Sequence, residues 1–201
     1  QNLEMMQRKL NVKDQKVVLY VGRLRKQKGV DYLIHAFSML RNEVDNVVLI
    51  IIGNGECMGE LTTLSKKLNV NHHTLFLGYI ENSKLGTYYN MCDVLVMPSI
   101  TYEQADAWGF VINEAMYFSK PVIASDAVGA SFDMIENGKN GYIVPERNSE
   151  AIYQALKDIL GDPSVERKMG HCSKRIVDER FRYSNMVEGF AAAIEYVRGS
   201  N

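Results

Sequence analysis

The sequence has few of the features that mark membrane, secreted or nucleic-acid-binding proteins. No apolar run approaches the ~20 residues of a membrane-spanning helix, and the amino-terminal residues QNLEMMQRKLNV do not resemble a signal peptide. The three cysteines, Cys57, Cys92 and Cys172, form no CxxC pair, which favours a reduced, intracellular protein. Lys and Arg (23) balance Asp and Glu (24), so the net charge of −1 argues against nucleic acid or an anionic membrane as the main ligand.

The sequence also lacks a clear metal-binding motif. It contains no Asp-x-Asp, and the neighbouring His72 and His73 have no Cys or carboxylate at ligand spacing. We therefore expect no metal ion and no other cofactor.

Short β-rich runs alternate with helical patterns through most of the chain. Strands are predicted at 16–22, 46–53, 74–78, 93–99, 121–125 and 141–145, and helices between them near 29–42, 56–69, 82–91 and 109–118. The β-rich runs are apolar throughout rather than alternating, which indicates strands covered on both faces. The pattern predicts an α/β fold of the Rossmann-like class, a doubly wound parallel sheet with helices on both faces.

Residues 1–201 are predicted to form a single domain. Residues 1–14 resemble a linker or the end of a preceding segment, 15–145 the α/β sheet, and 146–201 a helical tail with helices near 149–161, 163–179 and 183–198. The chain starts without Met, so we expect a part of something larger. In doubly wound sheets ligands bind outside the carboxyl ends of the strands, so we expect the site residues to lie there.

Basic residues follow the first predicted strand, in GRLRKQKG. Gly22 permits a tight exit, and Arg23 and Lys28 flank the loop that leads into the next predicted helix. A guanidinium and an ammonium beside the free amides of a helix N-terminus favour an anion such as a diphosphate. The alternative is a solvated basic loop, the role assigned to Arg25 and Lys26. The spacing leaves both interpretations open.

The second and third strands end in glycine-containing segments. GNGECMG resembles a dinucleotide fingerprint, but its last spacing is one residue too long and it follows the second strand, so the Rossmann signal is weak. Gly53 and Gly55 still allow the backbone to approach a ligand. Tyr79 and Ile80, which follow the third strand, are expected where a flat base rests against apolar side chains and backbone amides.

The long loop after the fourth strand, MPSITYEQADAWGF, leads into a helix expected to begin near Gly109. This helix is expected to be buried, because its apolar residues leave no clean polar face: Phe110, Val111, Ile112, Ala115 and Met116. A buried Glu114 needs a partner. The partner is either a ligand hydroxyl, as with the acidic residue that binds ribose in dinucleotide folds, or an Arg or Lys of a neighbouring element. The free amides near Gly109 to Val111 are expected to face a phosphate.

Taken together, these motifs resemble the carboxyl-terminal domain of family 4 retaining glycosyltransferases. The resemblance covers about residues 10–195 and rests on GRLRKQKG, IIGNG, FLGYI, DVLVMPS, WGFVINEAM and KPVIASDAVGASFDMIENGKNGYIV. It implies one Rossmann-like half of a GT-B architecture, with the active site in the cleft to a missing amino-terminal, acceptor-binding half. The predicted helix at 183–198 has amphipathic spacing that predicts packing, and in two-domain relatives the last helix crosses back to the other half.

The resemblance also implies roles for individual residues. Arg23 and Lys28 match the basic pair that holds the diphosphate of a nucleotide-sugar, and Glu114 matches the second Glu of an E-x7-E motif, which binds the ribose. Asp106 stands where the first Glu is expected, near the donor sugar. Because the loop before it is longer than the common pattern, Glu103 is a rival for that role. The last matches are the amides that meet the sugar and phosphates, at Gly109, Phe110 and Val111.

The implied activity is transfer of a sugar from a nucleoside diphosphate to an acceptor hydroxyl, with retention of configuration, in polysaccharide or glycolipid synthesis. The implied location is the cytoplasm or the inner face of the membrane, with peripheral association left open for the full protein. The isolated chain is expected to bind the donor nucleotide and to transfer little sugar.

Three other functions remain as alternatives. An NAD(P)-dependent oxidoreductase requires GxGxxG after the first strand, where this chain has GRLRKQKG. The others are a non-catalytic nucleotide-sugar-binding module and a GT-B-type UDP-sugar epimerase. The motifs favour the transferase.

Overall fold

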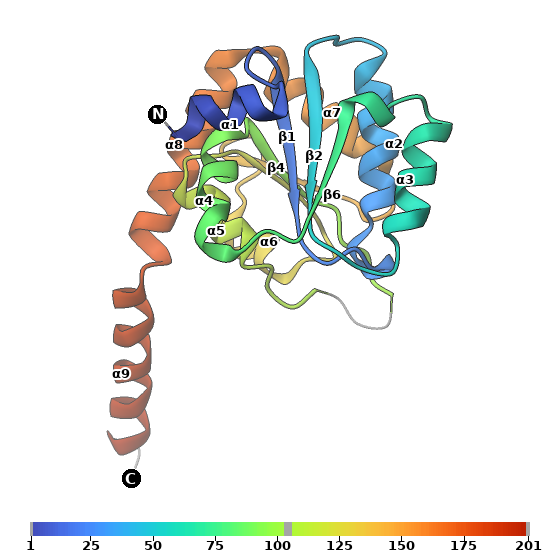
Figure 1. Ribbon diagram of the computed structural model, residues 1–201. Coiled ribbons are helices and arrows are strands. Elements are labelled where there is room, and N and C mark those ends of the chain that lie inside the picture. Colours follow the sequence, from blue (N-terminus) through green and yellow to red (C-terminus); the bar gives the residue numbers. More distant parts are fainter. Residues whose placement is uncertain (1, 103–105, 200–201) are drawn as a thin grey trace.

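The computed structural model describes residues 2–102 and 106–199 and shows a parallel sheet between two layers of helices (Figure 1). Its six strands are β1 (Lys16–Val21), β2 (Val47–Ile52), β3 (Thr74–Gly78), β4 (Val94–Met97), β5 (Val122–Ser125) and β6 (Gly141–Val144). They lie in the order β3-β2-β1-β4-β5-β6, and every neighbouring pair is parallel. This is the doubly wound order of Rossmann-like folds, as the sequence predicts.

The helices cover both faces of the sheet. One layer contains α2 (Val30–Arg41), α3 (Met58–Lys67) and α7 (Ser149–Gly161). The other contains α1 (Asn2–Leu10), α4 (Asn82–Met91), α5 (Val111–Tyr117), α6 (Gly129–Met134) and α8 (Pro163–Arg180). Two 3-10 helices, η1 (Lys26–Lys28) and η2 (Asn71–His73), precede α2 and β3.

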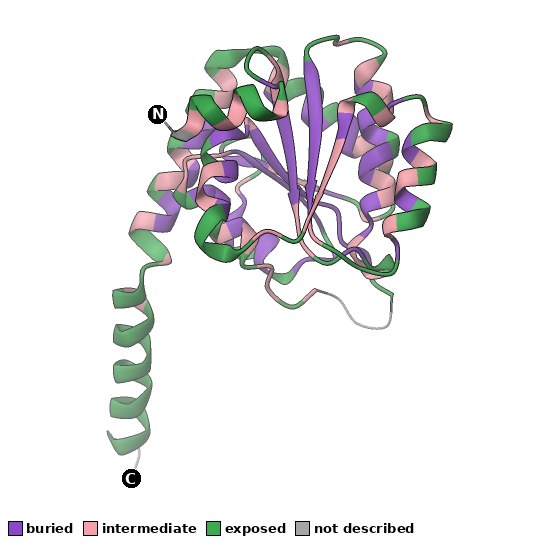
Figure 2. Cartoon of the chain, in the orientation of Figure 1, coloured by how far each residue is buried: buried purple, intermediate pink, exposed green. Residues whose placement is uncertain are grey.

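Each central strand contributes to two hydrophobic cores, one on either side of the sheet. In β1, Val18 and Tyr20 belong to the core under α2 and α7, whereas Val17 and Leu19 belong to the core under α4 and α5. Because side chains alternate across a strand, a strand buried on both faces must be apolar at every position. Figure 2 shows the strands as the buried centre of the domain.

The two tail helices that pack on the sheet begin at clear sequence signals. The side chain of Asn148 accepts a hydrogen bond from Ala151 N at 2.9 Å, and that of Asp162 accepts one from Ser164 N at 2.7 Å. Pro163 occupies the first turn of α8, where its missing N–H costs nothing. The hydrogen bond from Ser164 also lowers the pKa of Asp162.

Two short elements differ from the prediction. Helix α5 begins at Val111 rather than near Gly109, because Gly109 takes a left-handed conformation (φ +77°) that interrupts a right-handed helix. Helix α6 was not predicted, because six residues carry too little helical periodicity to be distinguished from a loop. Gly129 at its start allows close packing, since a Cβ there would lie 2.2 Å from the carbonyl oxygen of Ala107.

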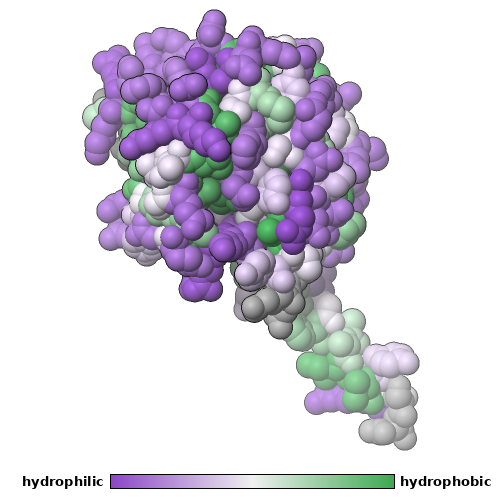
Figure 3. All heavy atoms as spheres, turned by 90° about the vertical axis from the view of Figure 1, so that its right-hand side faces the viewer, coloured by the Kyte–Doolittle hydropathy of each residue, from purple (hydrophilic) through white to green (hydrophobic). Residues whose placement is uncertain are grey.

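The last helix, α9 (Tyr183–Gly199), extends away from the domain and contains no buried residue (Figures 1 and 2). The prediction that this segment packs is therefore wrong for the part of the chain that the structure describes. Figure 3 shows apolar residues on the protruding helix. Its exposed apolar side chains are Tyr183, Met186, Val187, Phe190, Ile194, Tyr196 and Val197. All of these except Tyr196 recur every three or four positions and form one stripe, which we call the α9 stripe: Tyr183, Met186, Val187, Phe190, Ile194 and Val197.

Candidate functional site

The loops after β1 and β2 are pressed together at the carboxyl edge of the sheet. A Cβ on Gly53 would lie 1.8 Å from the carbonyl oxygen of Gly22, and one on Gly55 would lie 2.2 Å from that of Leu24. Gly53 also has φ +135°, which side chains disfavour. Gly53 and Gly55, which are predicted to let the backbone approach a ligand, let the two loops approach each other.

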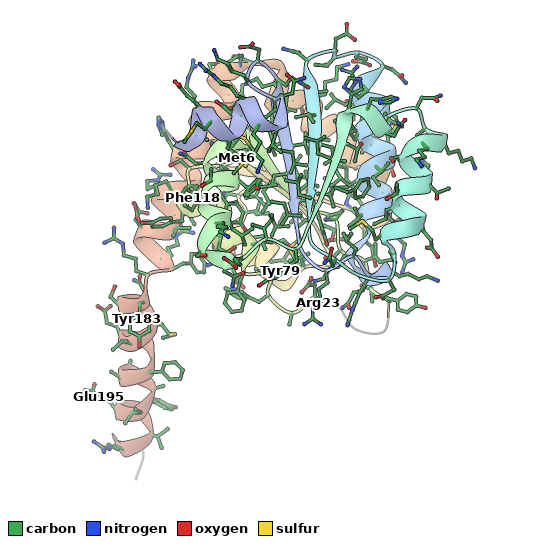
Figure 4. All side chains as sticks on the ribbon, in the orientation of Figure 1. Met6, Arg23, Tyr79, Phe118, Tyr183 and Glu195 are labelled. Atoms are coloured by element: carbon green, nitrogen blue, oxygen red, sulfur yellow. The ribbon has the colours of Figure 1, made fainter. Side chains whose placement is uncertain are left out.

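These loops line a cavity of about 470 Å³ together with the residues that follow β3. Its size is typical of small-molecule sites. It gathers six of the predicted site residues, namely Gly22, Arg23, Gly53, Gly55, Tyr79 and Ile80. Figure 4 shows Arg23 and Tyr79 at the same edge of the domain. Asn54 and Asn82 also line the cavity and were not predicted, because an Asn in a loop carries no distinctive sequence signal.

Arg23 is an exposed cation beside this cavity. Its carbonyl oxygen accepts a hydrogen bond from the hydroxyl of buried Tyr20 at 2.9 Å, which anchors the backbone of the loop. Burial raises the pKa of Tyr20, so this hydroxyl remains a donor. Nearby Arg25 lies 3.8 Å from Glu56, whereas Arg23 forms no salt bridge within residues 2–102 and 106–199. Its guanidinium is thus available to an anion.

Lys28 and Asp106 form an ion pair across the boundary between β1 and β4. Their side chains are 22% and 15% exposed, and Asp106 Oδ2 also accepts a hydrogen bond from Ser99 Oγ at 3.1 Å. The backbone of Asp106 is fixed as well, because its N–H donates to Ala127 O at 3.0 Å. The structure therefore joins two residues for which the sequence predicted separate contacts, one with the diphosphate and one with the sugar.

The topology explains this pairing. Strands β1 and β4 are neighbours, and at this position the strand order reverses, which is the switch point where ligands bind in such folds. Ile100 N donates to Gln27 O at 2.8 Å, and Gly29 leaves no room for a side chain beside the carbonyl oxygen of Pro98. The loops after β1 and β4 are thus held in contact.

Glu114 lies in a second hollow of about 450 Å³, which shares Asn82 and Leu85 with the cavity beside Arg23. The prediction that Glu114 is buried is wrong, because the seven-residue α5 buries only one face, formed by Ile112, Ala115 and Met116. The Glu114 side chain lies on the opposite, exposed face. Its recorded partner is not a cation, since the hydroxyl of Tyr89 donates to Glu114 Oε2 at 2.5 Å.

The predicted site residues at the start of α5 line neither hollow. Gly109, Phe110 and Val111 lie at the start of α5, and the Phe110 side chain is 73% exposed. Glu103 lies outside the described residues. Among residues 2–102 and 106–199, no group of three His, Cys, Asp or Glu could hold a metal ion.

The strand order defines a Rossmann-like domain, with a cavity at the carboxyl edge of its sheet. The family model of glycosyl transferases group 1 matches residues 2–175. The chain belongs to this family.

Two curated relatives are longer than this chain. The chain is 34% identical over 175 residues to an uncharacterised glycosyltransferase of Methanocaldococcus jannaschii, covering 87% of this chain and 43% of that protein. It is 32% identical over 168 residues to a GDP-mannose-dependent alpha-(1-6)-phosphatidylinositol monomannoside mannosyltransferase of Mycolicibacterium smegmatis, covering 82% and 44%. The chain thus spans less than half the length of these relatives.

The crystal structure of HepE from Anabaena in complex with UDP has the same fold as this chain. The TM-score is 0.86 at 22% identity, over 97% of this chain and 52% of HepE. The structures that the chain matches have GT-B architecture, and this chain corresponds to one Rossmann-like half of it. In the described part of the chain no helix is long and apolar enough to cross a membrane.

Proposed function

We propose that this chain is the donor-binding half of a retaining glycosyltransferase, and that the cavity beside Arg23 holds the diphosphate of a nucleotide-sugar. The observation that carries the proposal is the guanidinium of Arg23, which has no salt-bridge partner among the described residues and lies beside a cavity with two glycine loops. Membership of the family supports it. It is also supported by a relative named as GDP-mannose-dependent and by UDP in the HepE structure.

The proposed reaction breaks the bond between the anomeric carbon and a diphosphate oxygen and forms a bond to the acceptor hydroxyl oxygen. The proton of the acceptor hydroxyl passes to the departing diphosphate, on the same face of the sugar, which retains the configuration. Negative charge grows on the diphosphate as the bond breaks. Arg23 stabilises this charge, and a charge-assisted hydrogen bond of this kind contributes about 1.5–3 kcal/mol.

Lys28 and Asp106 are proposed to act on the donor as a pair. An ammonium group has three N–H donors, so Lys28 can bind a phosphate oxygen while it keeps Asp106 as a partner. Asp106 retains Oδ1 for a sugar hydroxyl, and Glu103 is the alternative for that contact. Glu114 binds the ribose, and the amides of Gly109, Phe110 and Val111 approach the sugar and phosphates.

The proposed partner of this chain is an acceptor-binding half of the full protein. The α9 stripe supports this proposal, because an apolar helix face that no described part of the chain buries favours association with another surface. The acceptor is a hydroxyl in polysaccharide or glycolipid synthesis. The three cysteines are free, in keeping with a reducing compartment such as the cytoplasm.

Calorimetric titration of the chain with UDP, GDP, ADP and NAD tests the donor site. We expect one nucleoside diphosphate to bind, and Arg23→Ala to weaken it about 10- to 100-fold. Arg175→Ala is the matched control, because Arg175 is also exposed but lies on α8, away from the cavity. Equal losses in the two variants, or no binding at millimolar concentration, contradict the proposal. Binding of NAD alone favours an oxidoreductase.

Two further measurements test the mechanism. Because protein cations are proposed in place of a metal, affinity for the diphosphate is expected to be the same in EDTA and in Mg²⁺, and a loss in EDTA would contradict this. Sugar transfer by the chain alone is expected to be negligible and to appear when the other half is supplied. Release of an epimerised sugar without acceptor favours the epimerase.

A further inference from the structure

Tyr89 is a rigid aromatic residue below the hollow that contains Glu114. It is 2% exposed, and its ring stacks on that of Phe118, with the centroids 5.9 Å apart and the planes at 21°. Gly86, one turn earlier in α4, leaves room for the Phe118 ring, since a Cβ there would lie 3.1 Å from Phe118 Cζ. The Tyr89 ring is therefore held in place by burial and by stacking on Phe118.

The Tyr89 hydroxyl emerges from this packing at Glu114. It donates to Oε2 at 2.5 Å, a length typical of strong hydrogen bonds between a hydroxyl and a carboxylate. Burial, and then the hydrogen bond to Glu114, raise the pKa of Tyr89, so the hydroxyl stays protonated. Among the described residues, the other oxygen of Glu114, Oε1, has no recorded hydrogen-bond partner and is open to a ligand.

We propose that Tyr89 is a positioning residue that holds the Glu114 carboxylate so that Oε1 accepts a hydrogen bond from a ribose hydroxyl. This inference rests on the proposed function. Tyr89 thereby makes the site selective for ribonucleotides over deoxyribonucleotides, because a site built to bind a hydroxyl rejects the analogue that lacks it. The two hollows share Asn82 and Leu85, so one nucleotide can extend from Arg23 to Glu114.

The advantage of this contact is pre-organisation. A Glu on the exposed face of a helix otherwise samples several rotamers, and ordering it on binding reduces affinity. Removing the Tyr89 hydroxyl is expected to lower affinity for the ribonucleotide about 2- to 10-fold, the range for one newly immobilised side chain. Affinity for the matching deoxyribonucleotide should barely change, so the ratio of ribonucleotide affinity to deoxyribonucleotide affinity falls.

The test is calorimetric titration with UDP and its 2′-deoxy and 3′-deoxy analogues, with the GDP series in parallel. The variants are Tyr89→Phe, Glu114→Gln and the two combined. Tyr88→Phe is the matched control, because Tyr88 is also buried on α4, but the hydroxyl that donates to Glu114 is that of Tyr89. Thermal unfolding checks each fold, and Tyr89→Phe keeps the ring that stacks on Phe118.

We expect Tyr89→Phe to narrow the ribose preference, Glu114→Gln to abolish it, and the double variant to match Glu114→Gln, since the two residues act as one unit. Tyr88→Phe should leave it unchanged. If Glu114→Gln abolishes the preference and Tyr89→Phe does not alter it, the positioning role is wrong and the ribose role of Glu114 stands. If Glu114→Gln has no effect, or no nucleotide binds, the ribose role fails and the inference with it.

Discussion

The two ends of the parallel sheet are held together by different means. At the amino end, three charged side chains bind one another: Lys16 Nζ lies 3.3 Å from Asp93 Oδ1 and 2.5 Å from Glu166 Oε2. Asp93 Oδ2 also accepts a hydrogen bond from Val17 N at 2.6 Å. These charges are satisfied within the protein, so their role is structural.

At the carboxyl end, the first two loops are in contact through backbone at glycine, and the one ion pair between them among the described residues, Arg25–Glu56 at 3.8 Å, is exposed. Gly53 and Gly55 let the loop after β2 rest on the loop after β1, and the nearby Arg23 has no salt-bridge partner in the part of the chain that the structure describes. Lys28 and Asp106 are paired but each has further hydrogen-bonding capacity. The comparison shows that contacts through glycine can hold loops in position while the polar side chains at the same edge stay available to a ligand.

Replacing Gly53 with Ala should have the largest effect on stability. The new Cβ meets a carbonyl oxygen at 1.8 Å, and the backbone has φ +135°. Backbone strain and overpacking each cost about 1–3 kcal/mol, so we expect a loss of about 3 kcal/mol in urea unfolding. Gly59→Ala is the control: it has open space in α3, so stability should rise by about 0.5–1 kcal/mol. Similar losses in both variants would show that the loop contact is unimportant.

Lys16→Met should destabilise the protein by about 2 kcal/mol at pH 7, because it leaves two largely buried carboxylates without their cation. Burial already raises the pKa of Glu166 in the intact protein, and loss of Lys16 raises it further. A carboxyl group whose pKa is raised in the folded state stabilises the fold at a pH below its unfolded-state pKa. This stabilisation is lost as the pH rises through the folded-state pKa. The variant should therefore lose less stability at pH 4 than at pH 8 in urea unfolding. Nucleotide affinity should stay unchanged, in contrast to Arg23→Ala.

Two buried tyrosines should make the protein sensitive to alkali. Burial raises the pKa of Tyr20, and burial with the Glu114 hydrogen bond raises that of Tyr89, above the ordinary value of 10.0. Their contribution to the free energy of unfolding is complete below pH 10. It is lost as the pH rises further, because only the unfolded chain releases these protons. Each tyrosine lowers the free energy of unfolding by about 1.4 kcal/mol per pH unit in this range. Tyr20→Phe should reduce the slope measured between pH 10 and 12, and an unchanged slope would contradict this.

Removal of residues 183–201 should have the smallest effect. No residue of α9 is buried, so the free energy of unfolding should change by less than about 0.5 kcal/mol. The same deletion in the full protein should be more costly, because the α9 stripe is proposed to contact the other half. A large loss in the isolated chain would mean that α9 packs on its own domain.

The main elements of the fold were predictable from local patterns. The strand at 74–78 and the helix at 82–91 have the observed bounds, and the other strands agree within two residues at each end. The β-rich runs are apolar at successive positions, which predicted a sheet covered by helices on both faces. In agreement, β1 contributes side chains to both hydrophobic cores. The short α6 and the protruding α9 were missed or misjudged, because amphipathic spacing does not reveal whether a partner surface is present.

The site was predictable only in part. Residues that follow strands of this sheet, such as Arg23 after β1 and Tyr79 after β3, converge because parallel strands bring their carboxyl ends to one edge. The contacts of Asp106 and Glu114 were not predictable, since their partners lie 78 and 25 positions away in the chain. The assumed burial of Glu114 failed because α5 is short and buries a single face.

Hydrophobic periodicity and turn residues thus define the parallel sheet and the edge at which a ligand binds, because both follow from backbone geometry within short segments. The packing of distant segments defines which charges at that edge are paired and which remain free. Arg23 is available and Lys28 is shared because pairing depends on distances between side chains from different elements. A local sequence pattern contains no record of those distances.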